Sequence, residues 1–335
     1  MAEKRRRRIL VRVLVAVVVL AVAAVFAGGA FLVDFALNPH ASFSMKSMTM
    51  EKAASEPETE AEPPALDADY AAEADAWFEA NKESVSHVAE DGTELLGWKA
   101  PAAAVDGAPY ADGHTYAVLC HGYIGQPSDM AKFAYHFAQQ GMVTLMPAAR
   151  GHERNIDAGY IQMGWQDSAD LVGWVNDLVA ADPEARIMLF GVSMGGAEVM
   201  MASGRNLPDN VRLIVEDCGY TSVWDEFSLQ LGEVFHLPSF PLLNAAELVG
   251  RGVAGYSFAE ASAVEQLHHA TVPMLFIHGD ADTFVPFSML DVVYDACASA
   301  DKEKLVVPGA EHAQSSSTDP ELYWSTIDAF VAARL

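Results

Sequence analysis

The sequence predicts an α/β fold, with a mainly parallel sheet that is covered by helices on both faces. Between residue 115 and the C-terminus, six short apolar runs alternate with segments of helical pattern. The runs are apolar throughout instead of alternating apolar and polar residues, which is typical of strands buried on both faces. The alternation of such strands with helices indicates parallel strands joined by helical crossovers.

The expected elements follow one another in the order that this fold requires. The strands are predicted at 115–120, 142–146, 186–190, 211–216, 273–278 and 304–308. The helices are predicted at 128–140, 166–180, 194–203, 288–299 and 320–334. The segment 225–262 is longer than a single crossover helix needs, so we expect a small cap there, above the carboxyl ends of the strands. Its apolar residues indicate a hydrophobic core within the cap, with an apolar pocket as the alternative.

The N-terminus has the pattern of a membrane anchor. Six basic residues occur within positions 4–12, and residues 13–33 form a run of 21 residues without a charge. A helix of this length crosses the hydrocarbon core of a bilayer. The basic segment 1–12 is expected to stay in the cytoplasm, which places the rest of the chain outside the cytoplasmic membrane.

A cleaved signal peptide is the alternative to an anchor, since the small residues Gly28 and Ala30 suit a cleavage site. The apolar run continues for three residues beyond that point, which favours an uncleaved anchor over a secreted protein. Residues 34–69 are rich in Glu, Pro, Ala and Ser and are predicted to form a disordered tether. The globular domain is expected from residue 70 to residue 335.

The charge balance and the cysteines limit the partners and cofactors. The chain has 46 acidic and 20 basic residues, and six of the basic ones lie within the first twelve positions. Such an acidic surface repels phosphates, so no nucleic-acid partner is expected. The three cysteines, Cys120, Cys218 and Cys297, lack metal-ligand spacing. Adjacent residues point apart on a helix, so the pair His268 and His269 does not indicate a metal site either. No cofactor and no metal is expected, and the sequence carries no signal for the oligomeric state.

Ser193 is the first candidate for a catalytic residue. It lies in the run GVSMGG between a predicted strand and a predicted helix. The glycines allow the sharp turn of a nucleophile elbow, and the positive end of the following helix stabilises negative charge that develops beside the serine. Glycine and serine are common, so this run predicts catalysis only together with a base, an acid and an oxyanion site.

A base and an acid follow other predicted strands. Serine needs a neighbouring base to remove its proton, and His312 lies in the loop after the last strand. Asp282 follows the preceding strand and can orient the imidazole. Asp217 also follows a strand and is the alternative acid, although a hydrogen bond within its own loop is an adequate role for it. The chain order nucleophile, acid, base is that of a known type of triad.

The oxyanion site is predicted from two loops. The backbone N–H of Met194 comes directly after the serine, and the N–H of Tyr123 lies in the loop HGYIG after the first of the six strands. Gly122 permits the turn of that loop. His121 is expected to hold the loop by hydrogen bonds rather than to take part in catalysis.

Five segments together resemble the α/β-hydrolase superfamily, namely HGYIGQPSDM, PAARGHERN, GVSMGG, HGDADTFVP and GAEHA. The sequence looks most similar to bacterial membrane-anchored or extracellular serine hydrolases related to the serine aminopeptidase and prolyl-oligopeptidase branches, over residues 83–335. The resemblance implies an α/β-hydrolase fold, a mainly parallel eight-stranded sheet with a small cap inserted after strand 6. It implies these roles: Ser193 as nucleophile, Asp282 as acid, His312 as base, and Tyr123 and Met194 as the oxyanion hole. Ala148 departs from the pattern of many relatives, which carry an Asp there that is usually structural.

The expected function is that of a membrane-anchored serine hydrolase, which cleaves an ester or amide bond of a small-molecule or peptide substrate through an acyl-enzyme. Peptidase or aminopeptidase-type activity, and acyl transfer to an acceptor other than water, are the alternatives on the same triad. A non-catalytic binding module is disfavoured because no triad residue or oxyanion glycine is missing. One fold hosts several substrate classes, so the resemblance does not name the substrate.

Overall fold

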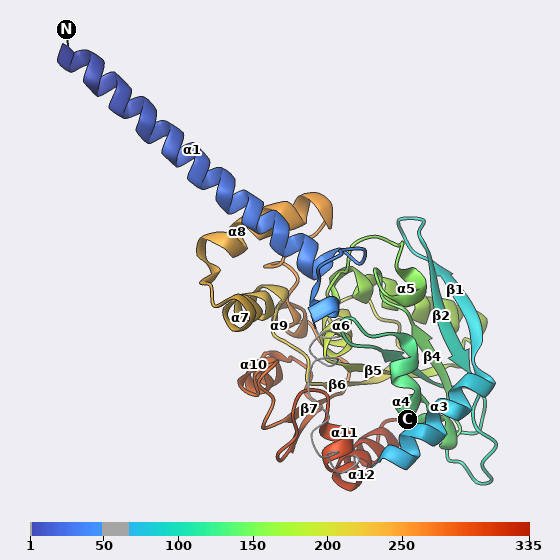
Figure 1. Ribbon diagram of the computed structural model, residues 1–335. Helices are drawn as coiled ribbons and strands as arrows, with labels where there is room; N and C mark the ends of the chain where they lie inside the picture. Colours follow the sequence, from blue (N-terminus) through green and yellow to red (C-terminus); the bar gives the residue numbers. More distant parts are fainter. Residues whose placement is uncertain (1, 49–66) are drawn as a thin grey trace.

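The structure is a computed structural model that describes residues 2–48 and 67–335. Its centre is one eight-stranded sheet with helices on both faces, which confirms the predicted fold class (Figure 1). The strand order is β1-β2-β4-β3-β5-β6-β7-β8. β2 pairs antiparallel with β1 and with β4, and the remaining neighbours pair in parallel.

The strands have the bounds β1 Glu83–Val88, β2 Glu94–Ala100, β3 Thr115–Cys120, β4 Val143–Pro147, β5 Arg186–Val192, β6 Val211–Asp217, β7 Met274–Gly279 and β8 Lys302–Val307. The α-helices have the bounds α1 Ala2–Leu37, α3 Ala68–Asn81, α4 Ala131–Gln139, α5 Trp165–Ala181, α6 Met194–Ser203, α7 Val223–Phe235, α8 Ser239–Val253, α9 Ala263–Leu267, α10 Ser288–Ala296, α11 Ser315–Thr318 and α12 Pro320–Ala332. Two short 3₁₀ helices are η1 Pro127–Met130 and η2 Glu153–Asn155.

Alternate residues of the central strands enter two hydrophobic cores, one on each face of the sheet. In β5, Ile187 and Leu189 belong to one core, and Met188 and Phe190 belong to the other. Side chains alternate between the two faces of a strand, so burial of both faces requires an unbroken apolar run. This is the physical reason why the six predicted strands lack polar residues at alternate positions.

The strands β1 and β2 had no counterpart among the strands predicted from the apolar runs. β1 lies at the edge of the sheet and pairs only with β2, so most of its side chains are exposed. An edge strand of this kind needs no apolar run, and the segment ESVSHV contains none.

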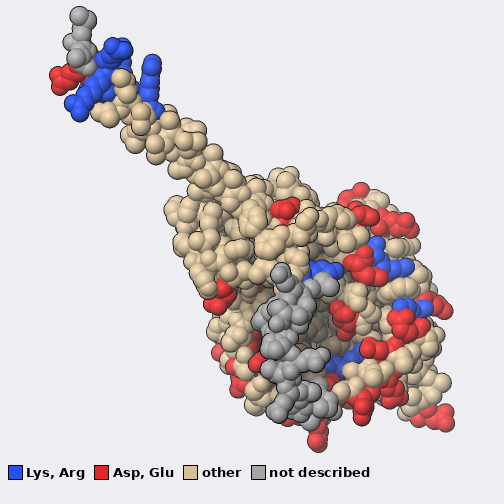
Figure 2. All heavy atoms as spheres, viewed as in Figure 1, with Lys and Arg blue, Asp and Glu red and all other residues tan. Residues whose placement is uncertain are grey.

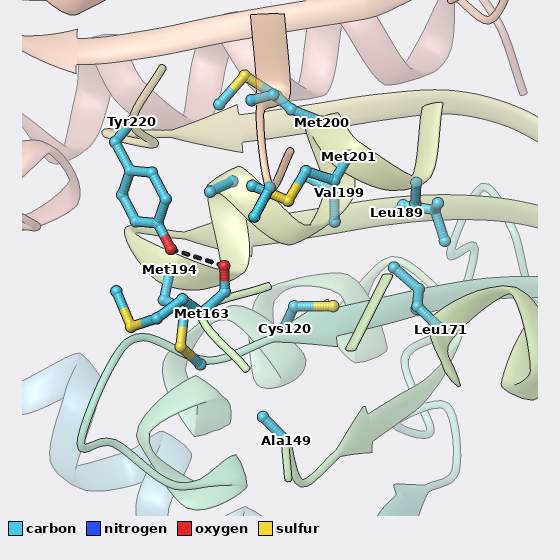
Figure 3. Packing of buried hydrophobic residues seen from close by; sticks show 14 of the residues in the cluster. Cys120, Ala149, Met163, Leu171, Leu189, Met194, Val199, Met200, Met201 and Tyr220 are labelled. Atoms are coloured by element: carbon cyan, nitrogen blue, oxygen red, sulfur yellow. Dashed lines mark hydrogen bonds between the residues drawn. The ribbon is translucent and has the colours of Figure 1, made fainter. Parts of the chain in front are cut away.

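The helix α6 lies directly beneath the carboxyl ends of the central strands. Every residue of α6 is buried, and its methionines pack against neighbouring apolar side chains (Figure 3). In the same core the hydroxyl of Tyr220 donates a hydrogen bond to the carbonyl of Met163 at 2.9 Å. The helix is therefore fixed on all sides, and the residue that precedes it, Ser193, is fixed with it.

The cap follows β6, as predicted, and consists mainly of α7 and α8. It begins two residues before the predicted start at residue 225, because Ser222 caps α7 by accepting a hydrogen bond from the Asp225 N–H at 3.0 Å. Both helices lie on the same side of the domain as α1, and α8 runs beside the last turns of α1 (Figure 1).

The long N-terminal helix α1 projects from the domain and then joins it. Its last turns lie against α8 (Figure 1). A Cβ atom on Gly29 would come within 2.6 Å of the backbone nitrogen of Ala246, so a residue without a side chain permits this close approach. The side chains of Val33, Phe35 and Leu37 are buried against the domain.

The structure places two boundaries differently from the sequence-based ones. Residues 34–37 continue α1 rather than starting a tether, because the side chains of Phe35 and Leu37 are buried against the domain. The globular part resumes at α3, whose first residue is Ala68 rather than residue 70. Half of the predicted tether, residues 49–66, lies outside the described residues.

The helix α1 is long and apolar enough to cross a membrane, a property that signal sequences near the N-terminus share. Lys and Arg side chains gather at its free end, whereas acidic side chains are spread over the visible face of the domain (Figure 2). The free end of α1 is therefore positively charged, whereas most of the acidic side chains belong to the domain at its other end.

All three cysteines are buried as free thiols. Cys120 ends β3, Cys218 follows β6, and Cys297 lies with its sulfur 3.7 Å from the sulfur of Met274. The three cysteines therefore form no disulfide with one another in the structure.

Candidate active site

Ser193 occupies the sharp turn between β5 and α6. Its backbone has φ 58° and ψ −115°, a conformation that is rare for a residue with a side chain. Two backbone hydrogen bonds hold this turn: the Ser193 N–H donates to the Asp217 carbonyl at 2.8 Å, and the Ser193 carbonyl accepts from Ala197 at 2.9 Å. The strained turn raises the hydroxyl above the sheet edge, as in a nucleophile elbow.

The turn depends on the glycines that flank it. A Cβ atom on Gly191 would lie 2.0 Å from the carbonyl oxygen of Gly195, and one on Gly195 would lie 2.1 Å from the carbonyl oxygen of Cys120. These distances are far below any allowed contact with backbone. The two glycines therefore let β5, β3 and α6 meet closely beneath Ser193.

The structure brings Ser193, His312 and Asp282 together in one chain of hydrogen bonds. The Ser193 Oγ lies 2.8 Å from Nε2 of His312, and Nδ1 of His312 lies 2.7 Å from Oδ2 of Asp282. His312 follows β8 and Asp282 follows β7, so each side chain comes from the carboxyl end of its own strand. With Nδ1–H donating to the carboxylate, Nε2 is left to accept the serine proton.

Asp282 is a buried carboxylate with four hydrogen-bonding contacts. Its Oδ1 accepts from the backbone N–H groups of Phe284 at 2.9 Å and Val285 at 3.0 Å. Burial on its own would raise the pKa of Asp282, but hydrogen bonds from His278 and His312 outweigh it and lower the pKa to about 2. The carboxylate is therefore ionised at neutral pH, as the orienting role requires.

His278 is a site residue that sequence reasoning did not assign. It is fully buried, and its Nε2 lies 2.9 Å from the Val285 carbonyl and 3.3 Å from Oδ2 of Asp282. Burial on its own would lower the pKa of His278, but the hydrogen bond to Asp282 outweighs this effect, so the pKa is raised overall. The available signal was the spacing of four residues between His278 and Asp282 in HGDAD, at the end of a predicted strand.

Asp217, the alternative acid, has different partners. Its Oδ2 accepts a hydrogen bond from the Tyr323 hydroxyl at 2.8 Å, and its Oδ1 accepts from the Ser315 hydroxyl at 3.3 Å. Among the hydrogen bonds of the described residues, none joins Asp217 to His312. The carboxylate thus ties the end of β6 to α11 and α12, while Asp282 faces the imidazole.

The two N–H groups predicted for the oxyanion hole belong to the first residue of α6 and to the loop that follows β3. Met194 is the first residue of α6, where a backbone N–H has no partner within the helix. Tyr123 follows Gly122, and a Cβ atom on Gly122 would lie 3.6 Å from the Ser193 Cβ. The loop that carries Tyr123 therefore lies next to the nucleophile. Within the described part of the chain, neither N–H donates to a protein acceptor.

Two buried histidines hold the loop that carries Tyr123. Nδ1 of His121 donates to the Gly122 carbonyl at 2.8 Å, and its Nε2 accepts from the Ala149 N–H at 3.1 Å. His152 accepts from the Ile124 N–H at 3.1 Å. Burial lowers the pKa of both histidines, which keeps them neutral and able to accept these bonds. His121 thus makes the loop-holding contacts predicted for it.

Ser193 separates two spaces of different character. An apolar pocket of about 770 Å³, partly open to solvent, lies between Ser193, the cap and the end of α1. A wider cleft of about 1300 Å³, also partly open, is lined by Ser193, His312 and polar side chains such as Lys132 and Gln314. The nucleophile therefore has an apolar side without His312 and a more polar side that contains it.

Cys218, Asp282 and His312 place potential metal-ligand atoms within 4.8 Å of one another. Burial raises the pKa of the Cys218 thiol well above its usual value, so the sulfur stays protonated and is a poor ligand. The facing nitrogen of His312 and Oδ2 of Asp282 already bond to each other. This group of atoms fits a hydrogen-bonded acid and base better than a metal centre.

Comparison with known proteins gives a family for most of the domain. The model of the prolyl oligopeptidase family matches residues 128–335. An uncharacterised protein of Bacillus subtilis, YqkD, is 24% identical over 225 residues, which cover 67% of this chain and 73% of that protein. A monoacylglycerol lipase of Mycolicibacterium smegmatis is 25% identical over 264 residues, which cover 68% of this chain and 91% of the lipase.

Among solved structures, the esterase Pf2001 of Pyrococcus furiosus superposes with a TM-score of 0.60 at 18% identity. The superposition covers 76% of this chain and 91% of the esterase. At this identity the similarity shows a shared fold, the α/β-hydrolase fold.

Proposed function

Because the chain belongs to the prolyl oligopeptidase family of α/β-hydrolases, we propose that it is a membrane-anchored serine hydrolase in which Ser193 forms an acyl-enzyme. The substrate is an ester, amide or peptide. The observation that carries the proposal is the pair of hydrogen bonds from Ser193 to His312 at 2.8 Å and from His312 to Asp282 at 2.7 Å.

The proposed reaction has two halves, the formation of the acyl-enzyme and its hydrolysis, and the same residues of the site act in both. Nε2 of His312 takes the proton of the Ser193 hydroxyl while Oγ attacks the carbonyl carbon of the substrate. The N–H groups of Tyr123 and Met194 stabilise the oxyanion, and Asp282 stabilises the imidazolium. His312 then protonates the leaving group, which departs as the acyl-enzyme forms. Water, deprotonated by the same nitrogen, attacks the acyl-enzyme and releases the acid and free Ser193.

Both ester and amide substrates fit the proposed mechanism. The family model is that of a peptidase family, whereas the relative from M. smegmatis is a lipase and the superposed structure is an esterase. Acyl transfer to an acceptor other than water uses the same acyl-enzyme. A panel of p-nitrophenyl esters and aminoacyl arylamides, tested on the full chain in detergent, separates these activities.

The nucleophile is tested by covalent labelling. We expect a fluorophosphonate probe to label the full-length protein once per chain, because the triad makes Ser193 the most reactive hydroxyl. Mass spectrometry of the labelled tryptic peptides should place the probe on Ser193. A probe found on another serine, or no labelling of folded protein, would rule out the proposed mechanism.

The proposed anchoring predicts the location of the domain. We expect protease added to intact spheroplasts to remove the domain, because the basic residues before α1 keep the N-terminus in the cytoplasm. An N-terminal epitope tag should stay protected and membrane-bound in the same sample. A domain that is degraded only after lysis would reverse the orientation, and loss of the tag from the mature protein would indicate a cleaved signal peptide.

A further inference from the structure

The apolar pocket beside Ser193 is built in part by the anchor helix itself. Leu32, Val33, Phe35 and Ala36, from the last turns of α1, line it together with the cap. On the cap side, α7 contributes Leu231 among others. A hydrophobic segment that served only to hold the protein at a membrane would have no reason to end in the wall of the active site.

The end of α1 is joined to the site by polar contacts as well as by packing. The last carbonyl groups of a helix have no partner within the helix. In α1 the Ala36 carbonyl accepts a hydrogen bond from the Tyr123 hydroxyl at 2.6 Å, and the Leu37 carbonyl accepts from the Ile161 N–H at 2.9 Å. Tyr123 also carries one of the N–H groups assigned to the oxyanion hole, so the helix end is tied to the catalytic loop.

The position of His312 assigns the two sides of Ser193 to the two parts of a substrate. His312 protonates the leaving group, so the leaving group lies on the side that contains the imidazole. That side is the wide cleft, which His312 lines. The acyl group then lies on the opposite side, in the apolar pocket, which Ser193 lines and His312 does not.

The lining of the pocket selects for an apolar acyl group. Its buried walls include Leu243, Ala246 and Phe258, and the polar side chains Glu226 and Gln230 bond to each other at 2.9 Å. Oε2 of Glu226 is buried without a hydrogen-bond partner among the described residues, so it is one polar contact that the pocket offers to a substrate. A peptide chain has more N–H and C=O groups than this contact can pair, whereas a hydrocarbon chain gains from burial along the apolar walls.

The surroundings of the pocket indicate where such a chain comes from. The cap beside α1 exposes large apolar side chains, namely Leu237, Phe240, Leu248 and Val253. The uncharged run 13–33 overlaps the turns of α1 that pack on the cap at Gly29. A helix that spans the bilayer therefore places this face of the cap at the membrane surface.

We propose that the pocket formed by the end of α1 and the cap binds the acyl chain of a single-chain fatty acyl ester taken from the membrane, with the leaving group in the cleft beside His312. This inference rests on the proposed function, since it names the substrate class of the same site. It assigns the anchor helix a second role as a determinant of specificity.

The test measures kcat/KM of the full chain in detergent micelles for p-nitrophenyl esters from acetate to hexadecanoate. The leaving group is constant, so differences report the acyl side alone. We expect kcat/KM to rise at least tenfold from acetate to the optimum chain length, since each buried methylene adds apolar contact. A flat profile, or a maximum at acetate, would overturn the inference.

Two pocket-filling variants with matched controls connect the profile to the pocket. Val33→Trp and Leu231→Trp act at buried positions in its two walls, with exposures of 3% and 4%. Val22→Trp on α1 and Val292→Trp on α10 introduce the same side chain at positions with exposures of 51% and 49%. The pocket variants should lower kcat/KM for dodecanoate at least tenfold and that for acetate less than threefold, with full fluorophosphonate labelling. The controls should match the wild type.

The outcomes separate this inference from the proposed function. Equal losses on acetate and dodecanoate in correctly labelled pocket variants would overturn the assignment of the pocket to the acyl chain. Higher activity of Val33→Trp on every ester would make α1 an obstructing lid and would also overturn it. No turnover of any ester, together with no labelling, would instead refute the serine hydrolase mechanism.

Discussion

The substitution Ser193→Ala is expected to lower kcat for ester hydrolysis by roughly five to six orders of magnitude, the scale seen when a triad nucleophile is removed. The change deletes the atom that attacks the carbonyl and leaves His312 without a proton to take. It removes only one hydroxyl from the structure, and the two backbone hydrogen bonds of Ser193 remain. The fold and the substrate pocket should therefore persist.

The measurement is the steady-state rate on the best p-nitrophenyl ester, with fluorophosphonate labelling and thermal unfolding measured on the same preparation. Labelling should disappear while the unfolding temperature stays within a few degrees of the wild type. A stable variant that keeps more than about one thousandth of the rate would show that another residue carries the reaction, because the oxyanion site and substrate binding alone account for only the small remainder.

The substitution Asp282→Asn is expected to lower kcat by roughly three to four orders of magnitude with KM little changed. An asparagine amide would donate toward Nδ1 of His312, which would then have to accept, so that the ring proton moves to Nε2. The nitrogen that faces Ser193 could no longer take its proton. The large effect follows from a tautomer change rather than from a lost contact with the substrate.

The matched control is Asp217→Asn, which changes the same atoms in the other candidate acid. Among the hydrogen bonds of the described residues, the Asp217 carboxylate bonds to Tyr323 and Ser315 and not to His312, so the control should lose stability rather than kcat. Thermal unfolding of both variants separates the two effects. If Asp217→Asn is the more damaging of two equally stable variants, the acid of the triad is Asp217.

The positions of Ser193, Asp282 and His312 could be predicted because each follows its own strand. In a parallel sheet, the carboxyl ends of neighbouring strands meet at one edge, and β5, β6, β7 and β8 are neighbours in the sheet in the order of the sequence. The apolar runs and the glycines around Ser193 were therefore sufficient to place the three side chains near one another. Their hydrogen bonds required the structure.

Two features were beyond the sequence pattern for a common physical reason. His278 contacts Asp282 because β7 ends in a turn that brings the chain back on itself, and no periodicity encodes that return. The last turns of α1 pack on protein, yet they belong to the same helix that is long and apolar enough to cross a membrane. A hydrophobic run indicates that a segment is removed from water, but it does not indicate whether the segment contacts lipid or protein.

Under the proposed orientation, which places the domain outside the cytoplasmic membrane, the burial of Cys120, Cys218 and Cys297 has a consequence for oxidation. A thiol attacks a disulfide or meets an oxidant as its thiolate, and burial raises the pKa of all three thiols, which suppresses that form. The three thiols of the folded domain therefore react slowly with oxidants and with other disulfides. The unfolded chain exposes the same three sulfurs, so oxidation competes with folding only before the sheet closes over them. A chain that is oxidised first carries crosslinks that the native packing does not contain, and it is trapped in a non-native form.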